Sequence, residues 1–265
     1  MKIERVNVLG VGVSAINLDL AKEAFAEAIA EKKKGYVCVR DIHGIMQSQK
    51  DAPLRAIHNQ AFLCTPDGMP LVWLGKLNGF KKMNRVYGPD LMLEIFGISA
   101  AQGFRHFFYG GANGAAQELK NKMEKRFPAL QIVGIFEPPF RPLNTEEEKS
   151  LQQMVAETKP DIMWIGLSTH KQEKFMAEFL PKLETTLMVG VGAAFDFHSG
   201  RIKQAPRWIQ RSGFEWFYRV CSEPRRLGRR YLKNVPLFMG HMFCQLTGLK
   251  KYSLPTLSGE KSGLS

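Results

Sequence analysis

The sequence lacks the features of a disulfide-rich, zinc-binding or membrane-spanning protein. Its four cysteines lie far apart and form no C-x-x-C pair, a spacing that fits buried thiols in a reducing compartment. No stretch offers the roughly 18 uncharged apolar residues that a spanning helix needs. Charged residues between Asp19 and Glu23 interrupt any signal-peptide core. We therefore expect a chain made in the cytosol that can lie on a membrane but does not cross it.

Several nucleotide-binding signatures are missing as well. The sequence has no G-x-G-x-x-G motif, no Walker loop with Gly-Lys-Ser/Thr and no Asp-x-Asp pair that could hold a metal on a diphosphate. Glu137 stands roughly where a dinucleotide-binding protein has its ribose-binding acid. A nucleotide-dependent oxidoreductase stays an alternative on that residue, although the glycine pattern does not support it.

Acidic residues are scarce in the last quarter of the chain. The formal net charge is +12, and residues 201–265 hold thirteen Lys or Arg against three Glu, which is +10 of that charge. Aromatic residues are interleaved with the basic ones from 201 to 233. This composition predicts a polyanionic partner: an anionic bilayer, a phosphate-bearing lipid or a nucleic acid. A nucleic-acid-binding protein would explain this quarter but not the loops of the first 200 residues.

Up to about residue 200, short apolar runs alternate with helix-length segments, which predicts a mainly parallel, Rossmann-like α/β sheet covered by helices on both faces. The expected strands are residues 6–13, 36–40, 62–65, 106–109, 132–136, 162–165 and 187–191. The expected helices between them are residues 19–33, 90–102, 115–127, 145–158 and 171–180. Thr145 is expected to cap its helix, with a glutamate of the first turn completing a capping box.

The rest of the chain predicts a basic, amphipathic helical appendage. Helices are expected over residues 208–221 and 224–232, the apolar segment 235–249 follows, and residues from 253 onward are rich in Ser, Gly and Lys. We expect a catalytic domain over residues 1–200, a membrane-docking appendage over 201–250 and a disordered tail over 251–265.

Ligands of parallel sheets bind beyond the carboxyl ends of the strands, so the loops that follow strands are the candidate sites. Asp67, in the loop Thr65–Pro70, can offer a carboxylate to a cleft as a general base, or it can be a simple turn residue. The glycines of residues 110–114 can bring backbone N–H groups to a diphosphate, or they can form a tight turn.

Three further loops contain candidate residues. Pro89 and Asp90 suit a helix start, which leaves Arg85 without a structural task and makes it a candidate cation for a phosphate or leaving group. Lys171 and Gln172 can face a sugar or phosphate. Asp196 can accept a hydrogen bond from a base or ribose, or it can belong to an ordinary strand-end turn.

Taken together, these loops resemble the WecG/TagA/CpsF glycosyltransferase family over about residues 5–240. The matching segments are TPDGMP (65–70), RVYGPDL (85–91), FFYGGANG (107–114), PPFRP (138–142), PDIMWIG (160–166), KQE (171–173), GVGAAFDFHSG (190–200) and QAPRWIQRSG (204–213). The segment from 215 to 226, which contains EW and EPRR, also matches. Thr169-His170 and Arg40 to His43 depart from the pattern of many members, and both segments are expected to face the donor sugar.

The resemblance implies an inverting transfer of a sugar from UDP to an undecaprenyl-diphosphate-linked sugar in cell-surface polysaccharide biosynthesis. The sugar would be N-acetylmannosamine or its uronic acid, and the departures leave a hexose open. No cofactor or metal is implied. Asp67 would be the general base, with Arg85 and Gln172 as further catalytic residues lining the donor site. The substrate would also contact Arg40, Thr65, Gly110, Gly111, Gly114, Gly166, Lys171, Gly192 and Asp196.

The resemblance also assigns the appendage to the acceptor and the membrane. Its residues for this role would be Trp216, Phe217, Arg219, Arg226 and Arg229. The expected partners are therefore the UDP-sugar, the polyprenyl-diphosphate-linked sugar and an anionic membrane surface, with no nucleic acid and with a homo-oligomer left open. The expected location is peripheral, at the cytoplasmic face of the bacterial inner membrane.

Overall fold

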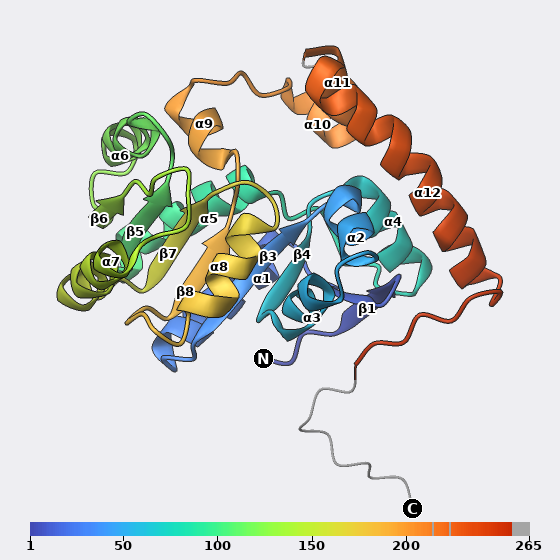
Figure 1. Cartoon of the computed structure of the whole chain (residues 1–265), viewed down its shortest axis with the longest axis horizontal. Coiled ribbons are helices and arrows are strands. Elements are labelled where there is room, and N and C mark those ends of the chain that lie inside the picture. The colour runs from blue at the N-terminus through green and yellow to red at the C-terminus, as the bar shows by residue number, and fades with distance from the viewer. Residues whose placement is uncertain (214, 223, 256–265) are drawn as a thin grey trace, which may run out of the picture.

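A six-stranded, fully parallel sheet forms the centre of the computed structural model, which describes residues 1–213, 215–222 and 224–255 (Figure 1). The strand order is β4-β3-β8-β7-β5-β6. The strands are β3 (Gly35–Arg40), β4 (Leu63–Pro66), β5 (Arg105–Gly110), β6 (Gln131–Phe136), β7 (Ile162–Gly166) and β8 (Leu187–Gly190). The α/β class and the parallel sheet predicted from the sequence are thus confirmed.

Helices cover both faces of this sheet, because successive strand residues point to opposite sides and both sides are buried. Phe108 of β5 and Trp164 of β7 belong to one hydrophobic cluster, whereas their neighbours Phe107 and Met163 belong to the other. The helices of this part are α1 (Leu18–Ala30), α2 (Ile42–Ser48), α3 (Ala52–Gln60), α4 (Met69–Leu77), α5 (Gly88–Gln102), α6 (Ala115–Arg126), α7 (Thr145–Thr158), α8 (Lys171–Phe179) and α9 (Ala194–Ser199).

The first predicted strand, residues 6–13, is wrong in one respect. The segment folds as an antiparallel hairpin of β1 (Arg5–Val8) and β2 (Val11–Ser14) outside the main sheet. Leu9 and Gly10 form its turn with φ of 52° and 79°. Two positive φ values are what a two-residue hairpin turn requires, but the first turn position usually carries Asn, Asp or Gly. Because Leu occupies that position, residues 6–13 form one continuous apolar run in the sequence, and the turn is not visible in it.

Four of the shorter helices, α2, α3, α4 and α9, were not expected from periodicity. The side chains of Asp41 and Asp51 begin α2 and α3 by accepting hydrogen bonds from the N–H groups of Gly44 and Leu54. In α7 the capping box consists of Asn144 and Glu147, one residue earlier than expected.

The C-terminal part contains α10 (Arg207–Ser212), α11 (Glu215–Ser222), the π-helix η1 (Pro224–Gly228) and α12 (Arg229–Leu246). The expected helix 208–221 is interrupted at Gly213, whose φ of 83° is left-handed. The expected break before residue 235 is absent, because α12 continues through Pro236. Buried Phe238 and Met242 hold this helix on the core and outweigh the missing N–H of the proline.

The end of α12 is tied to the N-terminal hairpin. Gln245 accepts a hydrogen bond from the Leu9 N–H at 2.8 Å and donates one to the Asn7 carbonyl at 2.8 Å. The following residues up to 255 return along the hairpin, where the Tyr252 hydroxyl bonds to His241 at 2.7 Å. Within the described part of the chain, no helix is both long and apolar enough to span a membrane. Residues 256–265 of the expected tail lie outside the described residues.

Candidate functional site

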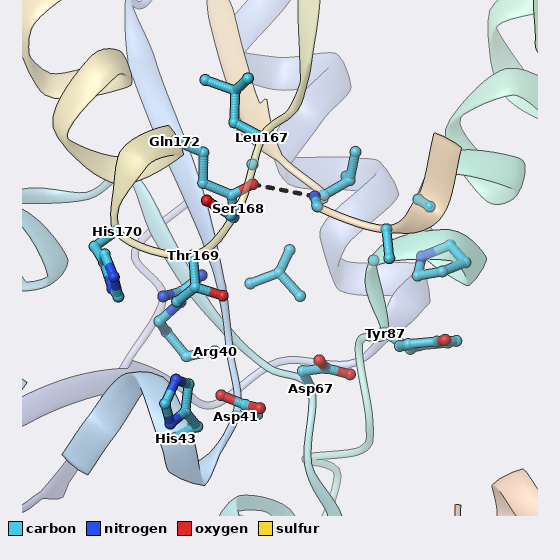
Figure 2. A pocket seen from close by; sticks show the side chains of 18 of the residues that line it. Arg40, Asp41, His43, Asp67, Tyr87, Leu167, Ser168, Thr169, His170 and Gln172 are labelled. Carbon is cyan, nitrogen blue, oxygen red and sulfur yellow. Dashed lines mark hydrogen bonds between the residues drawn. The ribbon is translucent and has the colours of Figure 1, made fainter. Parts of the chain in front are cut away.

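A polar cavity of about 330 Å³ opens at the carboxyl ends of β3, β4, β7 and β8 (Figure 2). The ends of these strands and the loops after them form its walls, together with residues of α2, α5, α8 and α9 and one side chain from α12. The loops converge because parallel strands end at the same edge of the sheet. Its polar and aromatic lining includes Arg40, Asp41, His43, Asp67, Tyr87, Thr169, His170, Gln172, Phe197 and Arg230.

Asp67 lies directly after β4, where two arginines fix its position. Its N–H donates to the Arg40 carbonyl at 2.8 Å. The Arg85 guanidinium donates to the Asp67 carbonyl at 2.5 Å and to its carboxylate oxygen Oδ1 at 3.3 Å. The Asp67 side chain stays 25% exposed. A fixed, partly exposed carboxylate at a cavity wall is suited to accept a proton from a bound hydroxyl.

Arg85 does have a structural task, so that expectation is wrong. Besides contacting Asp67, its guanidinium pairs with Glu215 of α11 at 2.7 Å and lies 4.2 Å from the centre of the Tyr87 ring. Burial opposes the charge, but Asp67 and Glu215 together raise the pKa of Arg85 above its usual value. Arg85 therefore positions Asp67 and connects α11 to the sheet, and it does not line the polar cavity.

A buried network joins three walls of the cavity. Arg40, 2% exposed, pairs through Nη2 with Glu173 Oε1 at 2.5 Å. The same carboxylate oxygen accepts from Gln172 Nε2 at 2.8 Å, and Gln172 Oε1 accepts from the Gly192 N–H at 3.1 Å. The chain of contacts runs from β3 through α8 to the loop after β8. Gln172 thus uses its amide to hold the wall, and Arg40 Nε has no hydrogen-bond partner within the described residues.

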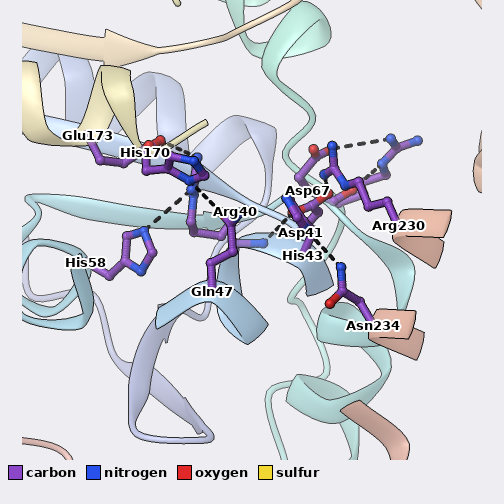
Figure 3. Close-up of polar contacts among 12 residues, drawn as sticks. Arg40, Asp41, His43, Gln47, His58, Asp67, His170, Glu173, Arg230 and Asn234 are labelled. Carbon is purple, nitrogen blue, oxygen red and sulfur yellow. Dashed lines mark hydrogen bonds and ion pairs between the residues drawn. The ribbon is translucent and has the colours of Figure 1, made fainter. Parts of the chain in front are cut away.

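A second set of contacts closes the cavity from the side of α12 (Figure 3). Arg230 donates to Asp41 Oδ2 at 2.7 Å, and the Asn234 amide contacts His43 Nδ1 at 2.7 Å. Burial alone would raise the pKa of Asp41, but Arg230 and the Gly44 N–H hold it below its ordinary value. Burial and the charge of Arg230 lower the pKa of His43 to about 4. His43 is therefore neutral at physiological pH.

No individual role was expected for Tyr87 or Glu173. Asp41 lies in the segment 40–43 that was expected to face the donor sugar, and Arg230 belongs to the basic appendage that was expected to meet the membrane. Nothing in the sequence connects Glu173 with Arg40, which stands 133 positions earlier. The two departing segments, 40–43 and 169–170, do line the same cavity.

Several predicted site residues do not line this cavity. Gly110 and Gly166 lie side by side on β5 and β7, and a Cβ on Gly110 would come within 2.6 Å of the Gly166 carbonyl oxygen. Arg201 fills the loop before Gly114 by donating to the Ala112 carbonyl at 2.8 Å. The contact with Gly166 explains Gly110 as a close-packing residue, whereas Gly114 is explained by its left-handed φ of 80°. The others outside the lining are Thr65, Gly111, Lys171 and Asp196.

Thr65 and Asp196 have contacts of their own. The Thr65 hydroxyl donates to the Val86 carbonyl at 3.4 Å and so ties the end of β4 to the residues before α5. The Asp196 carbonyl accepts from the Ile202 N–H at 3.1 Å, at the end of α9. Lys171 is exposed in the first turn of α8. Gly192, by contrast, lines the cavity as expected.

An apolar groove of about 580 Å³ lies between α4 and α12 and meets the polar cavity. Asp41, Asp67 and Tyr87 line both spaces. The apolar lining comes from Met69, Pro70, Trp73, Leu74, Leu77, Trp216, Val235, Phe238, Met239, Met242, Phe243 and Leu246. Figure 1 shows α12 passing along the edge of the molecule beside α2 and α4.

Of the residues predicted for acceptor and membrane contact, Trp216 lines the groove. Phe217, 55% exposed, packs edge-on against Trp216 with ring centres 5.8 Å apart. Arg229 is exposed at the start of α12. The side chains of Arg219 and Arg226 lie outside the described residues. Within the part that is described, no group of three His, Cys, Asp or Glu side chains is placed to hold a metal ion.

Comparison with known proteins matches residues 6–252 to the model of the glycosyl transferase WecG/TagA/CpsF family. Two similar proteins carry the name N-acetylglucosaminyldiphosphoundecaprenol N-acetyl-beta-D-mannosaminyltransferase. The one from Bacillus subtilis (strain 168) is 26% identical over 197 residues, which is 74% of this chain and 69% of the relative. The one from Bacillus spizizenii is 27% identical over 193 residues, which is 73% of this chain and 72% of the relative.

Proposed function

This chain belongs to the WecG/TagA/CpsF family of glycosyltransferases, and on that premise we propose that it transfers N-acetylmannosamine from UDP to the sugar of N-acetylglucosaminyl-diphosphoundecaprenol. The names of both relatives describe this acceptor and this transferred sugar. The uronic acid of N-acetylmannosamine and a hexose are the other donors that the loops at 40–43 and 169–170 leave open.

The observation that carries the proposal is the position of Asp67 where a polar cavity meets an apolar groove. A transfer from a nucleotide sugar to a lipid-linked sugar needs a polar donor site and an amphipathic acceptor site that meet at one base. Asp67 takes the proton of the acceptor hydroxyl while the hydroxyl oxygen bonds to the anomeric carbon. The bond from that carbon to the diphosphate breaks, UDP leaves, and the configuration inverts.

Arginines supply positive charge for the departing diphosphate. Arg40 and Arg230 both line the cavity, from β3 and from α12. Fixed cations in a poorly hydrated site stabilise developing negative charge without reorganising during the reaction. We propose on this basis that the transfer requires no metal.

We propose that the reaction takes place at the cytoplasmic face of the bacterial inner membrane, where a lipid-linked acceptor and a UDP-sugar can meet. Exposed Trp216 and Phe217, together with basic residues such as Arg229, are suited to reversible binding at an anionic surface. A cation near such a surface contributes roughly 1 kcal/mol.

The test is a UDP-release assay with the full chain, using a panel of UDP-sugars and an N-acetylglucosaminyl-diphosphoprenyl acceptor. We expect release that depends on the acceptor, is fastest with UDP-N-acetylmannosamine and persists in excess EDTA. Product mass identifies the sugar that was added. Absence of transfer with every donor in the panel, while the protein remains folded, would overturn the proposal.

A further inference from the structure

The groove between α4 and α12 exposes large apolar side chains next to the proposed catalytic base. Trp73 is 52% exposed, and on the facing helix Phe243 is 62% exposed. Single exposed apolar residues are common on protein surfaces, but a continuous cluster of them usually marks a binding surface. The groove holds the larger of the two volumes that meet at Asp67.

We propose that this groove binds the proximal part of the polyprenyl chain of the acceptor and thereby aims the acceptor sugar at Asp67. The inference rests on the proposed function and deepens it. The lipid would do more than hold the substrate in the bilayer, since its first isoprene units become a recognition element of the enzyme.

The division of the groove into a polar end and an apolar length matches an amphipathic ligand. Its polar residues are Asp41, Asp67, Arg85, Gln210 and Glu215, which lie at or near the junction with the cavity, whereas the remainder of its lining is almost entirely apolar. A ligand with a sugar diphosphate at one end and a hydrocarbon chain at the other satisfies both ends. Moving the hydrocarbon from water to the groove is favourable by about 25 cal/mol for each Å² of apolar surface buried.

The dimensions limit what the groove can hold. The lining of α12 extends from Tyr231 to Leu246, which at 1.5 Å per residue is roughly 22 Å. That length accommodates a few isoprene units and leaves most of an undecaprenyl chain outside, in the bilayer. The open side of the groove, where Leu77 and Leu246 remain exposed, gives the chain a way from the bilayer to the base.

Continuity with Asp67 distinguishes the polyprenyl chain from other occupants. Acyl chains of ordinary phospholipids could contact the exposed rim, but their head groups carry no sugar hydroxyl for the base. A second copy of the chain seated in the groove would close the route to Asp67. Only a molecule whose polar head is the reactant uses the cavity and the groove together.

The experiment compares acceptors that differ in lipid length. Transfer to N-acetylglucosaminyl-diphospho-undecaprenol and to its geranyl analogue is measured in the same detergent micelles, with the full chain and with Phe243→Gln. Phe243 lies roughly 18 Å along α12 from Tyr231, so a geranyl tail of two isoprene units depends less on this part of the groove than the undecaprenyl tail does. For Phe243→Gln we expect KM for the long acceptor to rise about tenfold, with a much smaller change for the geranyl acceptor and for the donor.

Leu237→Gln is the matched control. Leu237 is 42% exposed on the same helix, does not line the groove, and lies about 120° around the helix from Phe243. We expect this variant to keep the ratio of the two KM values unchanged. Equal losses in both variants that follow binding to anionic vesicles would show that α12 only meets the bilayer, and would overturn the proposal. A wild-type enzyme that does not distinguish the two acceptors would also overturn it.

A binding measurement separates this proposal from the proposed function. Undecaprenyl phosphate carrying a photoreactive group near its phosphate is crosslinked to the full chain, and the modified peptides are identified by mass spectrometry. We expect modification of α4 and α12, reduced in Phe243→Gln. If α4 and α12 are crosslinked but no donor is turned over, the lipid-binding role of the groove is supported and the proposed function is overturned. If transfer occurs but the crosslinks lie elsewhere or join two copies, the proposed function is supported and the lipid-binding role of the groove is overturned.

Discussion

The polar cavity and the apolar groove share Asp67 but are built in different ways. The cavity lies at the carboxyl edge of the sheet, where hydrogen-bonded strands fix the loops and buried side chains such as Arg40 and Glu173 hold one another. The groove is formed by two helices more than 150 positions apart in the sequence, and many of its apolar side chains face solvent. Few polar contacts hold α12, among them Arg230 with Asp41 and Gln245 with the hairpin.

The difference follows from what each region has to recognise. A sugar diphosphate presents charges and hydroxyls at fixed separations, so its site gains from side chains that are oriented before binding. A polyprenyl chain is flexible and apolar, and a surface of Met, Leu and aromatic side chains can adapt to it without directional bonds. Substitutions in the cavity should therefore affect both chemistry and stability, whereas substitutions in the groove should affect acceptor binding alone.

The largest effect is expected for Asp67→Asn, where the two regions meet. The amide keeps the shape and the contact with Arg85 but cannot take the proton of the acceptor, so kcat should fall roughly 10²- to 10⁴-fold. Initial-rate kinetics measure this, with the thermal midpoint as a check that the fold is unchanged. Asp19→Asn, at an exposed carboxylate in the first turn of α1, is the control. Turnover near that of the wild type would remove Asp67 from the role of base.

Glu173→Gln tests the claim that the cavity depends on buried charge. It leaves the Arg40 guanidinium buried without its counter-charge, which should lower the free energy of unfolding by about 3–5 kcal/mol. Urea denaturation measures the loss. Phe243→Gln in the groove should change the same quantity by less than about 0.5 kcal/mol, because that side chain is already 62% exposed.

The double variant Arg40→Met, Glu173→Leu sharpens this test. Removing both charges should recover much of the lost stability, since an apolar pair of similar volume avoids the desolvation cost. Transfer activity should stay low, because Arg40 also lines the cavity. If Phe243→Gln destabilises the chain as strongly as Glu173→Gln, the contrast between the two regions is wrong.

The same contrast explains which parts could be predicted from the sequence. The alternation of strands and helices is a local pattern, and it identified the loops after the strands as candidate sites. Arg40, Asp67 and Gln172 were predicted on that basis, and all three line one cavity. Parallel strands end at one edge, so residues far apart in the sequence converge there without any further signal. Gly110 and Gly114 were predicted to approach a ligand, because a glycine needed for packing or for a left-handed φ cannot be told from a phosphate-binding glycine in the sequence.

The contacts between distant segments could not be predicted. The basic and aromatic appendage was expected to meet a membrane, because nothing in the sequence shows that α4 faces α12. The partner of Arg40 is Glu173, and that of Arg85 is Glu215 in α11. Each pair depends on tertiary packing that brings the two segments together. The helix expected over residues 224–232 was not predicted to continue, yet the burial of Phe238 keeps α12 continuous through Pro236.

A smaller effect, on stability at acidic pH, is expected for His58. Its buried imidazole lies 3.4 Å from the Arg40 guanidinium. Burial, together with that charge, lowers the pKa of His58 to about 2. The unfolded chain takes up a proton below about pH 6.5 while the folded chain does not. The free energy of unfolding therefore falls with decreasing pH below 6.5, by about 1.4 kcal/mol per pH unit for this one group.

Urea denaturation of the wild type and of His58→Gln at pH 7 and pH 5 isolates that contribution. The variant should lose less stability between the two pH values, since it has no imidazole to protonate at this position. Other buried histidines such as His106, whose pKa burial lowers to about 3, add the same dependence to both proteins and cancel in the difference. If both proteins lose the same free energy of unfolding between pH 7 and pH 5, His58 does not contribute to the pH dependence of stability.

The smallest effect is expected for Arg230→Gln, which removes the contact that joins α12 to the cavity. The pair with Asp41 is partly exposed, with side-chain exposures of 26% and 30%, so its loss should cost only about 1 kcal/mol of unfolding free energy. The pKa of Asp41 should rise, because burial then acts without the opposing guanidinium. Since Arg230 lines the polar cavity and not the groove, KM for the donor should increase more than KM for the lipid acceptor. The control is Lys233→Gln, at an exposed cation of the same helix, which should change neither KM value. If Arg230→Gln instead raises only the KM for the acceptor, Arg230 belongs to the lipid site.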